Sequence, residues 1–139
     1  MSSDAKSHYS KVAQKLIADG ASNPDLQRAI QAGFDRKEQF QENWGTVNLT
    51  EFVEQFAPNA TRYATGAKIN YESEETGMVI VADISGYCRL GKKIPGQKKL
   101  LYLDIDGKDV RNVTLPNGKQ RGRSKSEQLE LTHFIIKKI

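Results

Sequence analysis

The apolar positions of the first 60 residues recur with the spacing of three amphipathic helices. The first ends at Gly20, the second begins at Pro24 after the capping residue Asn23, and the third follows the capping pair Asn48 and Glu51. Such stripes are typical of core packing rather than of ligand binding. Their apolar members are Tyr9, Val12, Ala13, Leu16 and Ile17, then Leu26, Ile30, Phe34 and Phe40, then Leu49, Phe52, Val53 and Phe56.

From about residue 67 the pattern changes to short β-rich runs separated by turns. The dipeptide Asp106-Gly107 predicts a hairpin turn. The runs are residues 68–71, 78–82, 87–90 and 100–103, with residues 132–139 as the final strand. The order of elements predicts a single α+β domain over residues 1–139. N-terminal helices (residues 1–60) would pack on a C-terminal antiparallel β-sheet of four to five strands (residues 67–139).

Hydrophobic residues make up 37% of the sequence and charged residues 27%. This composition predicts a soluble globular protein with a small core. No apolar run approaches the roughly 20 residues that span a bilayer, and the N-terminus lacks the apolar stretch of a secretory signal. We therefore expect no membrane segment and a site of action in the cytosol, or delivery by another component. The single Cys88 excludes an internal disulfide and predicts a buried thiol.

Charge is divided unevenly along the chain. Residues 1–88 carry 8 Lys and Arg against 12 Asp and Glu, whereas residues 89–139 carry 13 against 5. Two basic loops in the second part favour a nucleic-acid surface over a merely solvated loop. Tyr87 and Tyr102 alternate with these cations and can stack on bases. The basic residues are Lys92, Lys93, Lys98, Lys99, Lys119, Arg121, Arg123 and Lys125.

The histidine near the end of the chain is the leading catalytic candidate. A neutral His133 imidazole can accept a proton from a ribose 2′-hydroxyl, and an imidazolium can return one to a leaving oxygen. The basic loop of residues 119–125, with Arg89 from a neighbouring strand, can stabilise the phosphate. A hydrogen-bonded structural histidine is the competing interpretation. His8 lies in a polar helix and is expected to have no catalytic role.

No motif for a metal or a cofactor is present. Residues 104–109 superficially resemble a calcium loop, but its twelfth position is Leu115, where a glutamate is required. A metal-dependent DNase would need Asp83, Asp104 and Asp109 to converge. We expect neither a metal nor a cofactor.

Three short motifs in the β-rich part resemble a known class of domains. They are Gly86-Tyr87-Cys88-Arg89-Leu90, Tyr102-Leu103-Asp104-Ile105-Asp106-Gly107, and Thr132-His133-Phe134-Ile135-Ile136-Lys137. In this order they are similar to the C-terminal toxin domains of bacterial polymorphic and contact-dependent inhibition systems. That resemblance covers about residues 67–139 and implies a compact, barnase-like ribonuclease of the barnase, EndoU, colicin and RelE-like group.

The resemblance also implies a metal-free active site on the sheet face. Thr132 and His133 match the family's Thr-His-Phe motif. Tyr87 and Arg89 match its Gly-Tyr-x-Arg motif. Ile135 departs from the pattern, because a basic residue often follows the Phe. The C-terminal half holds no second histidine, so Lys or Tyr would supply the other proton transfer.

These features predict a metal-independent toxin endoribonuclease, with tRNA as one candidate substrate. It would cleave by 2′-hydroxyl attack to leave a 2′,3′-cyclic phosphate, and an acidic cognate immunity protein would cover its basic face. It would act in the cytoplasm of the cell it enters, delivered from another bacterium. The alternatives are a non-catalytic nucleic-acid-binding module, a metal-dependent DNase, and a protein-interaction or inhibitor domain.

Overall fold

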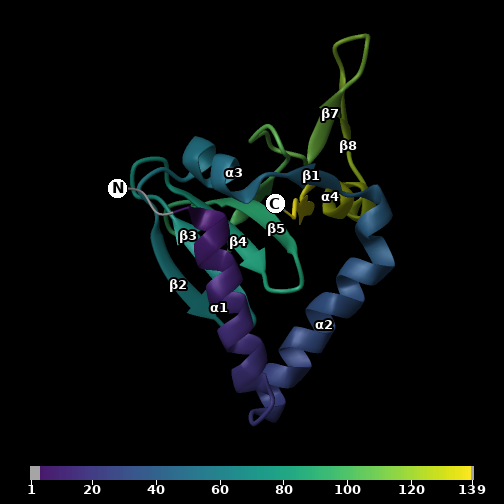
Figure 1. The fold of residues 1–139 in the computed structure, drawn as a ribbon. Helices are drawn as coiled ribbons and strands as arrows, with labels where there is room; N and C mark the ends of the chain where they lie inside the picture. The colour runs from purple at the N-terminus through teal and green to yellow at the C-terminus, as the bar shows by residue number, and fades with distance from the viewer. Residues whose placement is uncertain (1–3, 139) are drawn as a thin grey trace.

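Helices lead the chain and short strands follow, in a computed structural model that describes residues 4–138 (Figure 1). The helices in this range are α1 (Ala5–Gly20), α2 (Pro24–Phe40), the 3₁₀ turn η1 (Gln41–Asn43), α3 (Leu49–Phe56) and α4 (Lys125–Leu131). The strands are β1 (Gly45–Val47), β2 (Thr61–Thr65), β3 (Lys68–Glu72), β4 (Met78–Asp83), β5 (Tyr87–Lys92), β6 (Leu101–Leu103), β7 (Asn112–Thr114), β8 (Gln120–Gly122) and β9 (Phe134–Ile136).

The predicted helix starts are confirmed by their caps. The Asn23 side chain accepts a hydrogen bond from the backbone N–H of Leu26, and the Asn48 side chain accepts one from Glu51, at 3.2 and 3.1 Å. Each bond satisfies one of the backbone donors that the first turn of a helix leaves free. Local sequence therefore fixes where α2 and α3 begin.

The predicted α+β class is confirmed, and the sheet is larger than predicted. Within the described residues the main sheet has seven strands, in the order β1-β9-β5-β4-β3-β2, and β6 also pairs with β5. All its pairs are antiparallel except β1 with β9, which are parallel and align Gly45 with Phe134. The three-residue β1 and the mostly exposed β2 carry too little periodic pattern to be recognised in the sequence.

One face of the sheet packs against α1 and α3 and forms the core (Figure 1). Cys88 lies in this core and is fully buried, as predicted. On α2, however, only Ile30 of the predicted stripe is buried, whereas Phe34 and Phe40 are 41% and 46% exposed. The first part of α2 packs on α1, and its second part runs past the sheet towards α4 (Figure 1). The prediction of core packing was therefore wrong for Phe34 and Phe40.

Helix α4 was not anticipated, although the sequence contains its start signal. Ser124 and Glu127 form a capping box, in which each side chain bonds to the backbone N–H of the other residue. The basic character of residues 118–125 had favoured a loop. Among residues 4–138, no helix has both the length and the apolar composition needed to span a bilayer.

Helix α2 is held against the turn between β4 and β5 by polar contacts. Lys37 Nζ donates to the Ser85 carbonyl at 3.1 Å, and Arg36 Nη1 donates to the Tyr87 hydroxyl at 2.8 Å. Gly33, one turn earlier in α2, lies directly against the Asp83 carboxylate. A Cβ atom added at Gly33 would lie 2.8 Å from the Cγ atom of Asp83. The absence of a side chain at Gly33 is what allows this approach.

Gly33→Ala is expected to destabilise the protein. Alanine in a helix interior normally stabilises by up to about 1 kcal/mol relative to glycine, but here the added methyl group would push α2 away from Asp83 and cost about 1–3 kcal/mol. Urea denaturation measures the free energy of unfolding. Gly122→Ala, where the nearest atom to a new Cβ is 3.8 Å away, is the matched control and should change it little. An increase in stability for Gly33→Ala would contradict this packing.

Candidate active site

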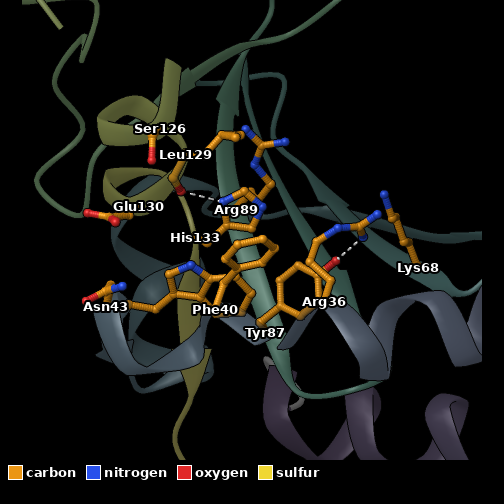
Figure 2. A pocket seen from close by; sticks show the side chains of 11 residues that line it. Arg36, Phe40, Asn43, Lys68, Tyr87, Arg89, Ser126, Leu129, Glu130 and His133 are labelled. Atoms are coloured by element: carbon orange, nitrogen blue, oxygen red, sulfur yellow. Dashed lines mark hydrogen bonds between the residues drawn. The ribbon is translucent and has the colours of Figure 1, made fainter. Parts of the chain in front are cut away.

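A pocket of about 490 Å³ opens on the sheet side opposite α1 and α3, between the end of α2, the strands and α4 (Figure 2). Pockets of this size hold a ligand as large as one nucleotide. It is lined by Arg36, Phe40, Asn43, Trp44, Lys68, Tyr87, Arg89, Ser126, Leu129, Glu130 and His133. These residues come from segments far apart in the sequence, so only the folded chain assembles the pocket.

Strand β5 places Tyr87 and Arg89 together in the pocket. Side chains alternate along a strand, so these two share a face while Cys88 and Leu90 enter the core. The same edge of β5 has two partners: Tyr87 and Cys88 pair with β9, whereas Leu90 to Lys92 pair with β6. Arg89 lies where the partner changes, and it therefore reaches residues that precede β9 as well as residues of β6.

The Arg89 guanidinium is largely buried and incompletely bonded. Its Nη2 donates to the Thr132 hydroxyl at 3.2 Å, and its plane lies over the Tyr102 ring with 3.5 Å from Cζ to the ring centroid. Its Nε is buried and has no hydrogen-bond partner. Burial lowers the pKa of Arg89, and no carboxylate pairs with it among the described residues. A largely buried cation without a carboxylate partner favours an anion nearby.

His133 is held in one tautomer by the backbone. Its Nδ1 lies 2.6 Å from the Leu129 carbonyl oxygen, which can only accept, so Nδ1 carries the proton and Nε2 of the neutral ring is an acceptor. The ring stacks on Trp44 at 4.9 Å between centroids with an interplanar angle of 17°, and Tyr87 lies 5.6 Å away. The imidazole is thus fixed in position and in protonation pattern.

Burial and positive charge keep His133 neutral. Desolvation of the ring, reinforced by the nearby Arg89, lowers the pKa of His133 to about 4, although its bond to the Leu129 carbonyl opposes this shift. At neutral pH the side chain is therefore a base with a free lone pair on Nε2. An anion bound beside it would favour the imidazolium and raise this pKa.

Tyr87 offers a proton donor next to His133. Its hydroxyl oxygen accepts the hydrogen bond from Arg36, which leaves its own O–H available. Burial raises the pKa of Tyr87, so the phenol stays protonated. Tyr87 also contacts Trp44, at 5.0 Å between ring centroids.

The pocket walls differ in charge. Arg36 and Lys68 lie on one side of the pocket, and Arg89 lies in the middle near His133 (Figure 2). None of these three cations has an ion pair within residues 4–138, and Glu130 is the one carboxylate of the lining. Three cations against one carboxylate favour a ligand carrying negative charge.

The structure brings together the four residues that were expected to be catalytic. His133, Arg89 and Tyr87 line the pocket, whereas Thr132 is buried and positions Arg89 instead of facing the pocket. Thr132 is fixed in turn by donating to the Gln128 carbonyl at 2.9 Å. His8 bonds to the Tyr71 hydroxyl at 3.0 Å and does not line the pocket.

The basic residues of the two loops do not line this pocket. Residues 108–125 instead carry the β7–β8 hairpin, which protrudes from the sheet (Figure 1). There Arg121 pairs with Glu127, and Arg123 donates to the carbonyls of Val110 and Asn112. In the other loop, Lys93 pairs with Glu72. The residues outside the pocket lining are Lys92, Lys93, Lys98, Lys99, Lys119, Arg121, Arg123 and Lys125.

Eight lining residues were missed by sequence reasoning. Trp44 is the main one, because it forms the floor beneath His133 and is 9% exposed. Its only local signal is its position as the single tryptophan, next to a helix end. The others are Arg36, Phe40, Asn43, Lys68, Ser126, Leu129 and Glu130.

The carboxylates considered for a metal-dependent DNase serve other purposes. Asp104 accepts from the backbone N–H groups of Asp106 and Lys108 at 2.9 Å each, which forms the predicted turn, and Asp109 pairs with Arg111. Asp83 accepts from the backbone N–H of Ser85 at 3.0 Å. Within residues 4–138, no three His, Cys, Asp or Glu side chains are grouped to hold a metal ion. The observed geometry thus gives the DNase interpretation no support.

The low pKa of His133 can be measured through Trp44, the single tryptophan. We expect the indole fluorescence to change with pH around a midpoint near 4, and the midpoint to rise when inorganic phosphate is added. His133→Gln should lack this transition, and His8→Ala, at the other histidine, should keep it. A midpoint near 6.5, the ordinary value for histidine, would contradict the buried, cation-flanked position.

Comparison of the chain with protein-family models, with curated proteins and with solved structures found no match. What the pocket does is therefore inferred from its own residues. They provide a fixed neutral imidazole, a phenol and three cations around a cavity of about 490 Å³.

Proposed function

We propose that the protein is a metal-independent endoribonuclease that cleaves by transesterification to a 2′,3′-cyclic phosphate. One observation carries the proposal: His133, Arg89 and Tyr87 line the same pocket, where they supply an imidazole with an acceptor Nε2, a cation without a carboxylate partner and a phenol whose O–H is not used. Acid–base cleavage of RNA needs a base, an acid and stabilisation of the phosphate.

The proposed reaction begins with His133. Its Nε2 takes the proton of the ribose 2′-hydroxyl, and the oxygen attacks the adjacent phosphorus. As the bond from phosphorus to the 5′-oxygen breaks, that oxygen takes a proton from the Tyr87 hydroxyl. One proton has then entered the imidazole and one has left the phenol, and exchange with water restores both groups. Because the nucleophile is the 2′-hydroxyl of the substrate itself, RNA is cleaved and DNA is not.

The cations provide the electrostatic part of catalysis. Arg89 already lies fixed between Tyr102 and Thr132, so it does not have to reorganise when charge develops on the phosphate oxygens. Arg36 is held by Tyr87, and Lys68 adds a third positive charge. The same charges lower the pKa of free His133 and keep it in the base form.

The protruding hairpin supports a substrate larger than one nucleotide. Residues 108–125 contain six Lys and Arg against one Asp. Gln128 donates to the Arg123 carbonyl at 3.0 Å, which ties the base of the hairpin to the pocket wall α4. Cations outside the pocket are suited to the phosphates of a folded RNA such as tRNA. The same basic surface suits an acidic immunity protein, and the proposed site of action is the cytoplasm of an invaded cell.

A second candidate is a binding module without catalysis. The stacking of His133 on Trp44 and its low pKa favour it, because both are also expected of a structural histidine. The two candidates differ in whether the bound RNA is cut.

The first test removes the base. His133→Ala is expected to reduce RNA cleavage by about 10²–10⁴-fold, and His8→Ala should leave it unchanged. Product analysis in the presence of a chelator should show the cyclic phosphate. The acid limb of kcat/KM is expected near pH 4, because protonation of the free base abolishes its function. Binding without cleavage would instead establish the second candidate.

The second test separates the pocket from the hairpin. Arg89→Ala should lower kcat by about 10²-fold or more, since it removes a fixed stabilising charge. Arg121→Ala should leave kcat unchanged. It should reduce the slope of log RNA affinity against log salt concentration by about one, which corresponds to the loss of one phosphate contact. Equal effects of the two substitutions on kcat would contradict the assignment of Arg89 to the reaction centre.

A further inference from the structure

The lining of the pocket also indicates which part of a nucleotide lies where. In Figure 2, Lys68 and Arg36 lie on one side, whereas Asn43, Ser126 and Glu130 lie on the other, with His133 and Tyr87 between them. A phosphate belongs beside the cations. The uncharged ribose and base would then extend towards the opposite side.

That opposite side has unused hydrogen-bonding groups. None of Asn43, Ser126 and Glu130 has a side-chain hydrogen bond to, or an ion pair with, another residue of the described range 4–138, and all three are exposed. Apolar surface lies next to them, because Phe40 and Leu129 line the pocket and are 46% and 43% exposed. An exposed aromatic ring beside free polar groups matches a nucleobase, which has a flat face and a polar edge.

Resting on the proposed ribonuclease function, we infer that Asn43 and Glu130 form a subsite for a base that carries an exocyclic amino group. A carboxylate oxygen only accepts hydrogen bonds, so Glu130 requires donors on the base edge. Adenine, cytosine and guanine each present an amino group. Uracil presents one N–H between two carbonyl oxygens, which the carboxylate repels. Asn43 both donates and accepts, and it therefore tolerates all three amino-bearing bases.

The base in this subsite belongs to the nucleotide that provides the 2′-hydroxyl. The pocket has room for about one nucleotide, and that nucleotide has to bring its 2′-oxygen to His133 and its 3′-phosphate to Arg89. The subsite thus selects the residue on the 5′ side of the cleaved bond.

Nucleoside 3′-monophosphates test the subsite without any cleavage, through the fluorescence of Trp44. Adenosine, cytidine and guanosine 3′-monophosphates are expected to bind about tenfold more tightly than uridine 3′-monophosphate, as one hydrogen bond to a charged group allows. Glu130→Gln should reduce this difference to within about threefold, because an amide can also donate to a uracil carbonyl. Glu38→Gln, an exposed carboxylate of α2 outside the pocket, is the control and should keep the tenfold difference.

The outcomes separate the subsite from the catalytic proposal. Equal binding of all four nucleotides, or discrimination that survives Glu130→Gln, overturns the subsite even if RNA is cleaved. If the wild type discriminates against uridine 3′-monophosphate and Glu130→Gln does not, the subsite is supported. If the wild type also fails to cleave RNA, that result counts only against the catalytic proposal. If none of the four nucleotides binds, the subsite is overturned, and RNA cleavage by the wild type and by His133→Ala decides the catalytic proposal separately.

Discussion

The divided edge of strand β5 is the constraint on which the site depends. Two short strands, β9 and β6, pair with the beginning and the end of the same edge. A single continuous partner would place its own side chains beside Arg89. Because the partner changes there, Arg89 instead lies over Tyr102 of β6 and bonds to Thr132 ahead of β9. The position of His133 next to Arg89 follows from the same arrangement.

The electrostatic character of the pocket follows from burying cations without carboxylates. Moving an arginine out of water is costly unless it is paired, and a neighbouring histidine responds by losing its proton. The desolvation cost of Arg89 is only partly compensated, because its buried Nε has no hydrogen-bond partner. The protein thus holds a site that is more favourable when an anion occupies it. The low pKa of His133 follows from burial and from the neighbouring cations, and an anion bound beside them would raise it.

Local chemistry in the sequence was enough to predict the helix starts, the turn after Asp104 and the α+β class. Cap residues act on backbone groups within one turn, so their effect is visible in a short segment. The convergence of His133, Arg89 and Tyr87 was accessible only through the order of motifs. Trp44 was not accessible, because it precedes β1, whose parallel pairing with β9 joins segments that are far apart in the sequence. The basic loop was misleading for the opposite reason: Arg121 and Arg123 are used by contacts near them in sequence.

The place of β9 inside the sheet has a consequence for the order of folding. β9 lies between β1 and β5 in the sheet. β1 therefore cannot become part of the sheet until residues 134–136 have paired with β5. Contacts between residues so distant in sequence require closure of a long loop, which carries a large entropic cost and slows folding. We therefore expect the pocket to be among the last features to form during folding. Until β9 pairs with β1 and β5, neither Trp44 nor His133 is held in the position that the pocket requires.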